Sequence, residues 1–335
     1  SPAYAHLRTE VARLTDARVL DAEDGTVQTW MQEPKHKLQA TATARIQVAK
    51  AEQLKSTMNA GQKALFKRAS KASAGGWLCV SPLQHKLEDV EMHYAIAARV
   101  LAPPFFVNTP TPTHCHVCPD YYGDMGDMWW IHATVCGKQH GGEDNQRHDN
   151  LRDALAKIMK SARIGRVVTE MNVAPGLYNI LPGRSATAVR ADIVVFEAAD
   201  VVSEIVEVKV AGRTFVNLRD DIFTPVARRA VDQYSDKCTV PRQIIKPFVV
   251  DQFGCLSKGA DDYLKYLASS VAPDKESAAH KDFLRKAYCA ISHALVRELA
   301  WKTGKYMVKA HIGFPIDIVH GGGGPSAAAA VQGVS

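Results

Sequence analysis

Two apolar segments with a strand-like alternation constrain the fold of this 335-residue chain more than any other feature. The first, 190–197, reads Arg-Ala-Asp-Ile-Val-Val-Phe-Glu, and the second, 203–210, reads Ser-Glu-Ile-Val-Glu-Val-Lys-Val. Side chains on a strand point alternately to opposite faces, so Glu207 and Lys209 share one face while the valines beside them share the other. The sequence therefore predicts two neighbouring strands, joined by a short turn.

Other segments alternate between helix-like and strand-like patterns. Helical spacing predicts helices at about 48–72, 87–101, 150–162, 221–237, 260–270 and 278–301, and apolar runs predict strands at 166–172, 191–197, 203–210 and 244–251. From residue 150 onward the order is helix, three strands, helix, strand. Apolar strands that alternate with amphipathic helices build helix-covered sheets, so we expect one mixed sheet with helices on both faces.

Polar side chains mark the ends of the two central strands. Asp192 begins the first, and Glu207 and Lys209 stand two residues apart on the second. Carboxylates on neighbouring strands suit a hard cation such as Mg²⁺, which polarises a phosphate and activates a water. A neighbouring ammonium group stabilises phosphorane charge. The pattern indicates metal-dependent phosphodiester chemistry, and its alternative is an ordinary solvated strand face.

Composition limits the class of protein. Hydrophobic residues make up 46% of the chain, which supports a real core, and the net charge of +6 permits a nucleic-acid partner without requiring one. No run of about 18 apolar residues occurs, so no membrane span is expected. Seven cysteines, several of them near histidines, favour a reducing intracellular compartment and a metal site over a disulfide framework.

The cysteines and histidines form a block between residues 113 and 150. Cys115 and Cys118 make a Cys-x2-Cys pair, and His132 and Cys136 are four apart, so they share one side of a helix. Three thiolates and one imidazole satisfy tetrahedral zinc. His140 is a competing fourth ligand, and the alternative is a set of buried thiols and surface histidines. Zinc here would stabilise a segment too short for its own core.

The order of Asp192 and Glu207-Val-Lys209 resembles the PD-(D/E)XK nuclease superfamily. From about residue 75 to 302 the chain also resembles the restriction-like endonuclease module that follows the reverse transcriptase in some eukaryotic non-LTR retroelements. The landmarks are Gly76-Trp77 with Pro82, Arg99-Val-Leu-Ala-Pro103, the Cys/His block, Arg147-His148 before the helix, Arg190-Ala-Asp192, Glu207-Val-Lys209 and Pro247-Phe-Val-Val before Gly254. Ala191 stands where the superfamily often has proline.

The resemblance implies a fold and a set of roles. The fold is a restriction-endonuclease-like αβββαβ core with a zinc-stapled, mostly helical N-terminal region. Asp192 and Glu207 would bind Mg²⁺ (or Mn²⁺), Lys209 would act on the scissile phosphate, and Glu170 would be a further acidic group. Gln233 and Tyr234 would orient substrate. Nucleic-acid contacts are expected from the basic residues near the core, namely Arg147, His148, Arg152, Arg190, Arg228 and Arg229.

Four segments follow from these expectations. They are a helical region with a Pro-rich linker (1–112), a zinc-binding subdomain (113–148), a nuclease-like domain (149–315) and a disordered Gly/Ala-rich tail (316–335). The expected function is a retroelement-derived endonuclease that cuts DNA rather than RNA, in the nucleus rather than in mitochondria. One alternative is a catalytically silent scaffold that binds nucleic acid within a ribonucleoprotein such as an organellar ribosome. Another is a zinc-dependent interaction module, and the oligomeric state is left open.

Overall fold

The structure is a computed structural model that describes residues 60–71, 73–76, 143–183, 188–211 and 221–309, together with 48, 52–53, 55–58, 87–88, 91–92, 94, 96, 114–115, 118 and 132. The chain divides into two compact units, Ser1–Lys63 and Ala64–Ser335. In the first unit the described residues are mostly helical, with an ion pair of 2.6 Å between Lys55 and Glu52. The predicted linker at 103–112 and the predicted tail at 316–335 lie outside the described residues.

A four-stranded mixed sheet lies at the centre of the second unit. Its strands are β1 (Arg166–Ala174), β2 (Val189–Phe196), β3 (Val202–Ala211) and β4 (Ile245–Asp251), in the order β1-β2-β3-β4. Strands β1, β2 and β3 are antiparallel neighbours, and β4 is parallel to β3. The single mixed sheet expected from the apolar alternation is confirmed, with each strand within two residues of its predicted ends.

Four helices accompany the sheet in the described part of this unit. They are α7 (Glu143–Ala162), α8 (Phe223–Ser235), α9 (Lys258–Val271) and α10 (Ala278–Lys309), and α4 (Ala60–Ala69) precedes them in the chain. Short 3₁₀ turns, η3 (Ala198–Asp200) and η4 (Arg242–Ile244), lie beside the strands. None of the described helices has the length and apolar character that crossing a membrane requires.

The predicted bounds of two helices were wrong. Helix α7 begins at Glu143, seven residues before the predicted start at Asn150. The predicted boundary between the zinc-binding and nuclease-like segments, at residues 148 and 149, therefore falls inside α7. Helix α10 continues to Lys309, eight residues beyond the predicted end at Trp301.

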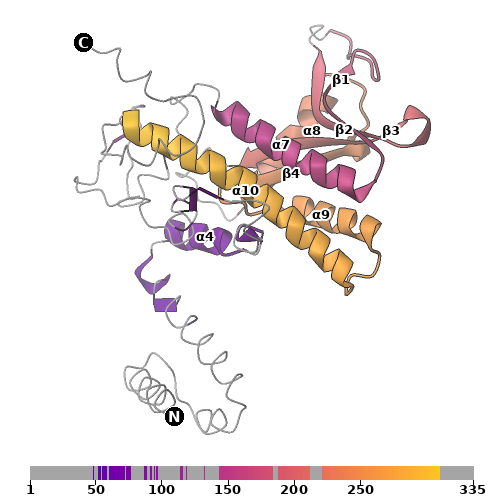
Figure 1. Cartoon of the computed structure of the whole chain (residues 1–335). Helices are drawn as coiled ribbons and strands as arrows, with labels where there is room; N and C mark the ends of the chain where they lie inside the picture. The colour runs from indigo at the N-terminus through magenta and orange to yellow at the C-terminus, as the bar shows by residue number, and fades with distance from the viewer. Residues whose placement is uncertain are drawn as a thin grey trace. The chain divides into compact units, whose positions relative to one another are not determined.

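Helices cover both faces of the sheet, as expected (Figure 1). On one face α7, α9 and α10 bury Leu155, Leu264 and Ile291 against the inward valines of β2, β3 and β4. On the other face α8 buries Tyr234 against Val194 and neighbouring side chains. Each face of the sheet therefore has its own apolar cluster.

The end of α4 and the residues after it pack against the end of β4, the turn that follows β4, and α10. Arg68 Nε lies 3.2 Å from the buried carboxylate of Asp251, which ends β4. The amide of Leu256 donates to Ser73 Oγ over 3.4 Å. Gly76 lies so close to α10 that a Cβ atom would stand 2.5 Å from the carbonyl oxygen of Tyr288. This contact requires glycine at position 76.

Candidate functional site

Asp192 and Glu207 meet across neighbouring strands. Ile193 pairs with Val206, so the next residues outward, Asp192 on β2 and Glu207 on β3, stand at the same level and on the same face. Asp192 Oδ2 accepts a hydrogen bond of 2.8 Å from the amide of Val208. The Asp192 carboxylate therefore closes the end of the β2–β3 ladder and is fixed by the backbone of the strand that carries Glu207.

Glu207 is held by three donors. Its side chain is 3% exposed, and Oε2 accepts a hydrogen bond of 2.5 Å from the Tyr234 hydroxyl on α8. Oε1 accepts from Gln233 Nε2 and from Lys209 Nζ. A carboxylate that leaves water must recover its lost hydrogen bonds inside the protein, and charge-assisted donors do this best. Helix α8 and the Glu-X-Lys spacing therefore fix Glu207 jointly.

His148 on α7 reaches Asp192. Its Nε2 atom lies 3.1 Å from Asp192 Oδ2, and its Nδ1 atom lies 3.3 Å from Asp149 Oδ1. The hydrogen bond to Asp192 is the main reason that the pKa of His148 is raised above its usual value. Burial opposes this rise, and so does the charge of Lys209. The sequence predicted His148 as a nucleic-acid contact, and its place beside Asp192 was not anticipated.

The pKa of the Asp192 carboxyl shifts in the opposite direction, downward. Burial, the largest single influence, acts to raise the pKa of Asp192. The hydrogen bond from His148, the charges of His148 and Lys209 and the Val208 amide together outweigh burial, so the pKa is lowered. Asp192 is therefore favoured as a carboxylate, the form that binds cations.

Glu170 lies at the same level on the next strand but is engaged by arginines. It stands between the pairs Thr169–Ile193 and Met171–Ala191, so it faces the level of Asp192, and its backbone has a positive φ of 57°. The Glu170 carboxylate forms ion pairs with Arg152 and Arg190. The structure thus directs Glu170 to two guanidinium groups.

The other predicted basic contacts are scattered. Arg152 is 8% exposed and also contacts Asp149 at 3.0 Å, so its guanidinium is occupied by carboxylates. Arg190 is exposed at the site edge, and Arg147 precedes His148 on α7. Arg228 and Arg229 are exposed on α8. Arg190 therefore contacts the carboxylate of Glu170, and His148 contacts that of Asp192. Among the described residues, Arg228 and Arg229 have no contact with either carboxylate.

A second polar cluster has ligands that could hold a metal ion. Cys115 and Cys118 are buried, and with His132 they place their ligand atoms within 4.8 Å of one another. Cys118 Sγ lies 3.2 Å from His132 Nε2, and the Cys118 amide donates to Cys115 Sγ over 3.4 Å. The predicted ligand Cys136 and its competitor His140 lie outside the described residues. Among residues that are described, no other group of three Cys, His, Asp or Glu side chains is this compact.

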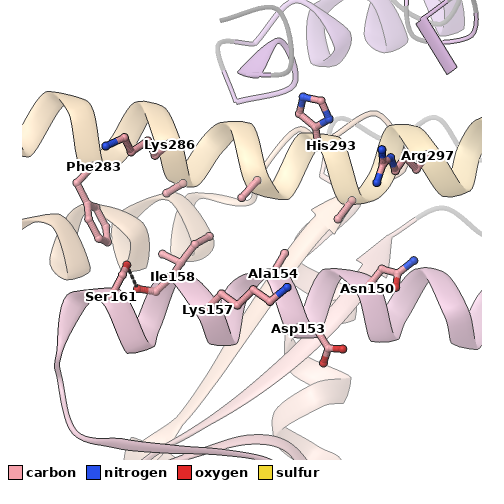
Figure 2. A pocket seen from close by; sticks show the side chains of 13 residues that line it. Asn150, Asp153, Ala154, Lys157, Ile158, Ser161, Phe283, Lys286, His293 and Arg297 are labelled. Atoms are coloured by element: carbon pink, nitrogen blue, oxygen red, sulfur yellow. Dashed lines mark hydrogen bonds between the residues drawn. The ribbon is translucent and has the colours of Figure 1, made fainter. Parts of the chain in front are cut away.

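A groove of about 530 Å³ runs between α7 and α10 (Figure 2). Its floor consists of small and apolar side chains such as Ala154, Ile158 and Ala287, and Lys157, Lys286 and Arg297 contribute positive charge. Asp192 and Glu207 do not line it. The groove is therefore a separate feature of the α7–α10 surface.

Fold and site together define a mixed α/β protein with an Asp/Glu/Lys cluster on the two central strands of its sheet. No family model matches the chain, and neither a curated protein nor a solved structure matches it.

Proposed function

We propose that this protein is a metal-dependent endonuclease that hydrolyses phosphodiester bonds in DNA, with its helices and strands forming a restriction-endonuclease-like core. The observation that carries the proposal is the position of Asp192 beside Glu207 on adjacent strands, with Lys209 on the same face. The sequence resemblance to the PD-(D/E)XK superfamily supports the same assignment of roles.

Asp192 and Glu207 would hold the divalent cation. In the described part of the chain, Asp192 Oδ2 accepts from the Val208 amide and lies beside His148 Nε2, so an ion can bind Oδ1, or Oδ2 in place of the proton shared with His148. A bound Mg²⁺ or Mn²⁺ would supply Lewis-acid activation of the phosphate. Tyr234 and Gln233 hold Glu207 in a fixed orientation. Lys209 places a positive charge where negative charge develops on the phosphate.

Zinc would occupy the cysteine cluster with a structural role. Thiolate and imidazole ligands suit zinc, which is bound tetrahedrally in structural sites. Cys115, Cys118 and His132 supply three ligands, and Cys136 is our proposed fourth. The amide of Cys118 donates to Cys115 Sγ and so disperses thiolate charge. The metal would then tie together segments that are distant in sequence.

Plasmid nicking tests the proposed function directly. Zinc-loaded wild-type protein should nick supercoiled DNA with Mg²⁺ or Mn²⁺. Asp192→Ala and Lys209→Ala should each reduce the rate by about 10² or more, because the first removes a cation ligand and the second removes a compensating charge. Circular dichroism should show that both variants are folded.

The matched control changes an exposed ion pair elsewhere. Asp262 and Lys258 form an i,i+4 pair on α9, and Asp262→Ala and Lys258→Ala should keep the wild-type rate. Equal activity in the wild type and Asp192→Ala would identify a contaminating nuclease. Absence of nicking with every divalent ion would contradict the enzymatic proposal.

The α7–α10 groove favours a second candidate function, a non-catalytic scaffold that binds nucleic acid. Lys157, Lys286 and Arg297 line this groove, and neutralised phosphates release counterions, so binding would weaken steeply with salt. Tight, salt-sensitive DNA binding without cleavage would favour the scaffold. Lys157→Glu should then weaken binding, whereas Lys209→Ala should not.

A further inference from the structure

The imidazole of His148 has no role in the proposed function, although it lies against Asp192. The two side chains are 27% and 15% exposed, so an ion can reach them from solution. Their Nε2 and Oδ2 atoms are 3.1 Å apart. An octahedral ion with bonds of about 2.1 Å holds neighbouring ligand atoms about 3 Å apart. The observed separation therefore suits two ligands of one ion as well as it suits a hydrogen bond.

The second ring nitrogen of His148 has the partner that a metal-binding histidine needs. Nδ1 lies 3.3 Å from Asp149 Oδ1. Metal-binding histidines usually donate this other N–H to a carboxylate or carbonyl, which fixes the tautomer whose lone pair faces the ion. Arg152 donates to the same Asp149 oxygen over 3.0 Å. The outer carboxylate is thus itself held in place.

We propose that His148 Nε2 is a direct ligand of the cation at Asp192, and that the site therefore selects Mn²⁺ and similar transition-metal ions over Mg²⁺. Imidazole is a good ligand for transition metals, whereas Mg²⁺ prefers oxygen and retains its water. This inference rests on the proposed metal-dependent function and adds a nitrogen ligand to its oxygen ligands. Asp149 and Arg152 act as positioning residues for His148.

Direct metal binding is the first test. MnCl₂ and MgCl₂ are titrated separately into protein whose cysteine cluster is already loaded with zinc, and affinity is measured by calorimetry. Wild-type protein should bind Mn²⁺ at least about tenfold more tightly than Mg²⁺. His148→Gln should weaken Mn²⁺ binding by about tenfold or more and change Mg²⁺ binding little. Lys160→Gln, at an exposed position on the same helix, should bind both ions as the wild type does.

Pulsed electron paramagnetic resonance of the Mn²⁺-loaded protein is the second test. A coordinated imidazole gives a ¹⁴N coupling, which should be present in the wild type and in Lys160→Gln and lost in His148→Gln. The wild-type spectrum gives an answer even if the variant does not fold. Asp149→Asn should keep the coupling but lower the Mn²⁺ affinity.

The outcomes separate this inference from the proposed function. A wild-type spectrum without ¹⁴N coupling, or equal losses of Mn²⁺ and Mg²⁺ affinity in His148→Gln, would overturn the assignment of His148. Nicking together with either result would leave the nuclease proposal intact. A ¹⁴N coupling that depends on His148, in a protein that never nicks DNA, would uphold the metal ligand and refute the enzyme.

Discussion

Buried carboxylates show at the residue scale how this site is built. Glu207 is almost fully enclosed, yet three donors from β3 and α8 reach its two oxygens. Asp251 is also enclosed, with two amides on Oδ1 and Arg68 beside Oδ2. Glu207 has donors on both oxygens, whereas Oδ2 of Asp251 has, among the described residues, only Arg68 beside it. Each arrangement leads to a measurable prediction.

We expect Tyr234→Phe to lower the free energy of unfolding by about 1–3 kcal/mol, because Glu207 Oε2 loses its donor inside the protein. Urea denaturation followed by circular dichroism measures this change. Tyr266→Phe is the control, since half of that side chain is exposed, and it should change stability by less than about 0.5 kcal/mol. Equal effects of the two substitutions would show that the hydroxyl of Tyr234 does not stabilise Glu207.

Asp251 should make stability depend on pH. Burial raises the pKa of Asp251 from 3.8 to about 6, although three backbone amides and the charge of Arg68 oppose the rise. The folded state therefore keeps this proton longer than the unfolded state does. As pH rises from about 4 to about 6, unfolded chains ionise first, and the contribution of Asp251 to stability falls by an amount on the order of 3 kcal/mol.

Comparison with Asp251→Asn isolates this effect, because the amide keeps an oxygen for the two backbone donors and does not titrate. The difference in unfolding free energy between wild type and variant should move in favour of the variant between pH 4 and pH 6. Arg68→Met should enlarge the fall, since its charge favours the carboxylate. A difference that is constant across this pH range would contradict the raised pKa.

At the scale of helices and strands, close packing between segments determines which positions must be glycine. Helix α10 runs beside α7, which covers one face of the sheet (Figure 1), and α10 also meets the turn after α4. The contact of Gly76 with the Tyr288 carbonyl leaves no room for a side chain. A Cβ atom added at Gly259 on α9 would have nothing within 4 Å. Close packing therefore requires glycine at position 76 but not at position 259.

The two glycines should respond oppositely to alanine. Gly76→Ala places Cβ against backbone, which cannot move cheaply, so we expect a loss of about 1–3 kcal/mol. Gly259→Ala adds a good helix former in open space and should stabilise the protein by about 0.5–1 kcal/mol. Thermal unfolding of both variants gives the answer. If Gly76→Ala is neutral, the segment after α4 does not pack on α10 as described.

At the scale of the whole molecule, the cysteine cluster would tie distant parts of the second unit together through one ion. We expect purified protein to contain about one equivalent of zinc, with metal–ligand distances of about 2.0–2.3 Å by X-ray absorption. Chelation should lower the thermal stability, because metal binding is coupled to folding. Cys118→Ser should lose most of the metal.

Cys238→Ser provides the control for zinc content. Cys238 is buried and hydrogen-bonds to the Tyr234 carbonyl, away from the metal cluster, so this variant should keep its zinc. Cys136→Ser should lose zinc if Cys136 is the fourth ligand. Zinc well below one equivalent in the wild type would refute the site.

The sequence by itself determined the elements and the sheet faces. Apolar alternation placed all four strands, and the Glu-X-Lys spacing put Glu207 and Lys209 on one face, because side-chain direction along a strand follows from its two-residue period. The Cys-x2-Cys pair with a later histidine predicted the compact group of Cys115, Cys118 and His132. These are local properties of the chain, which short sequence patterns encode.

Only the tertiary structure decided which polar groups meet. His148 is 44 residues from Asp192 in sequence, and Tyr234 is 27 residues from Glu207, yet each pair is in contact. Glu170, predicted as a further acidic group of the site, forms ion pairs with Arg152 and Arg190. The sequence pattern also did not predict the start of α7, because the first residues of this helix are polar and show no apolar periodicity. Such contacts depend on how helices pack across the sheet, and that packing is fixed by the summed burial of many apolar side chains rather than by any motif.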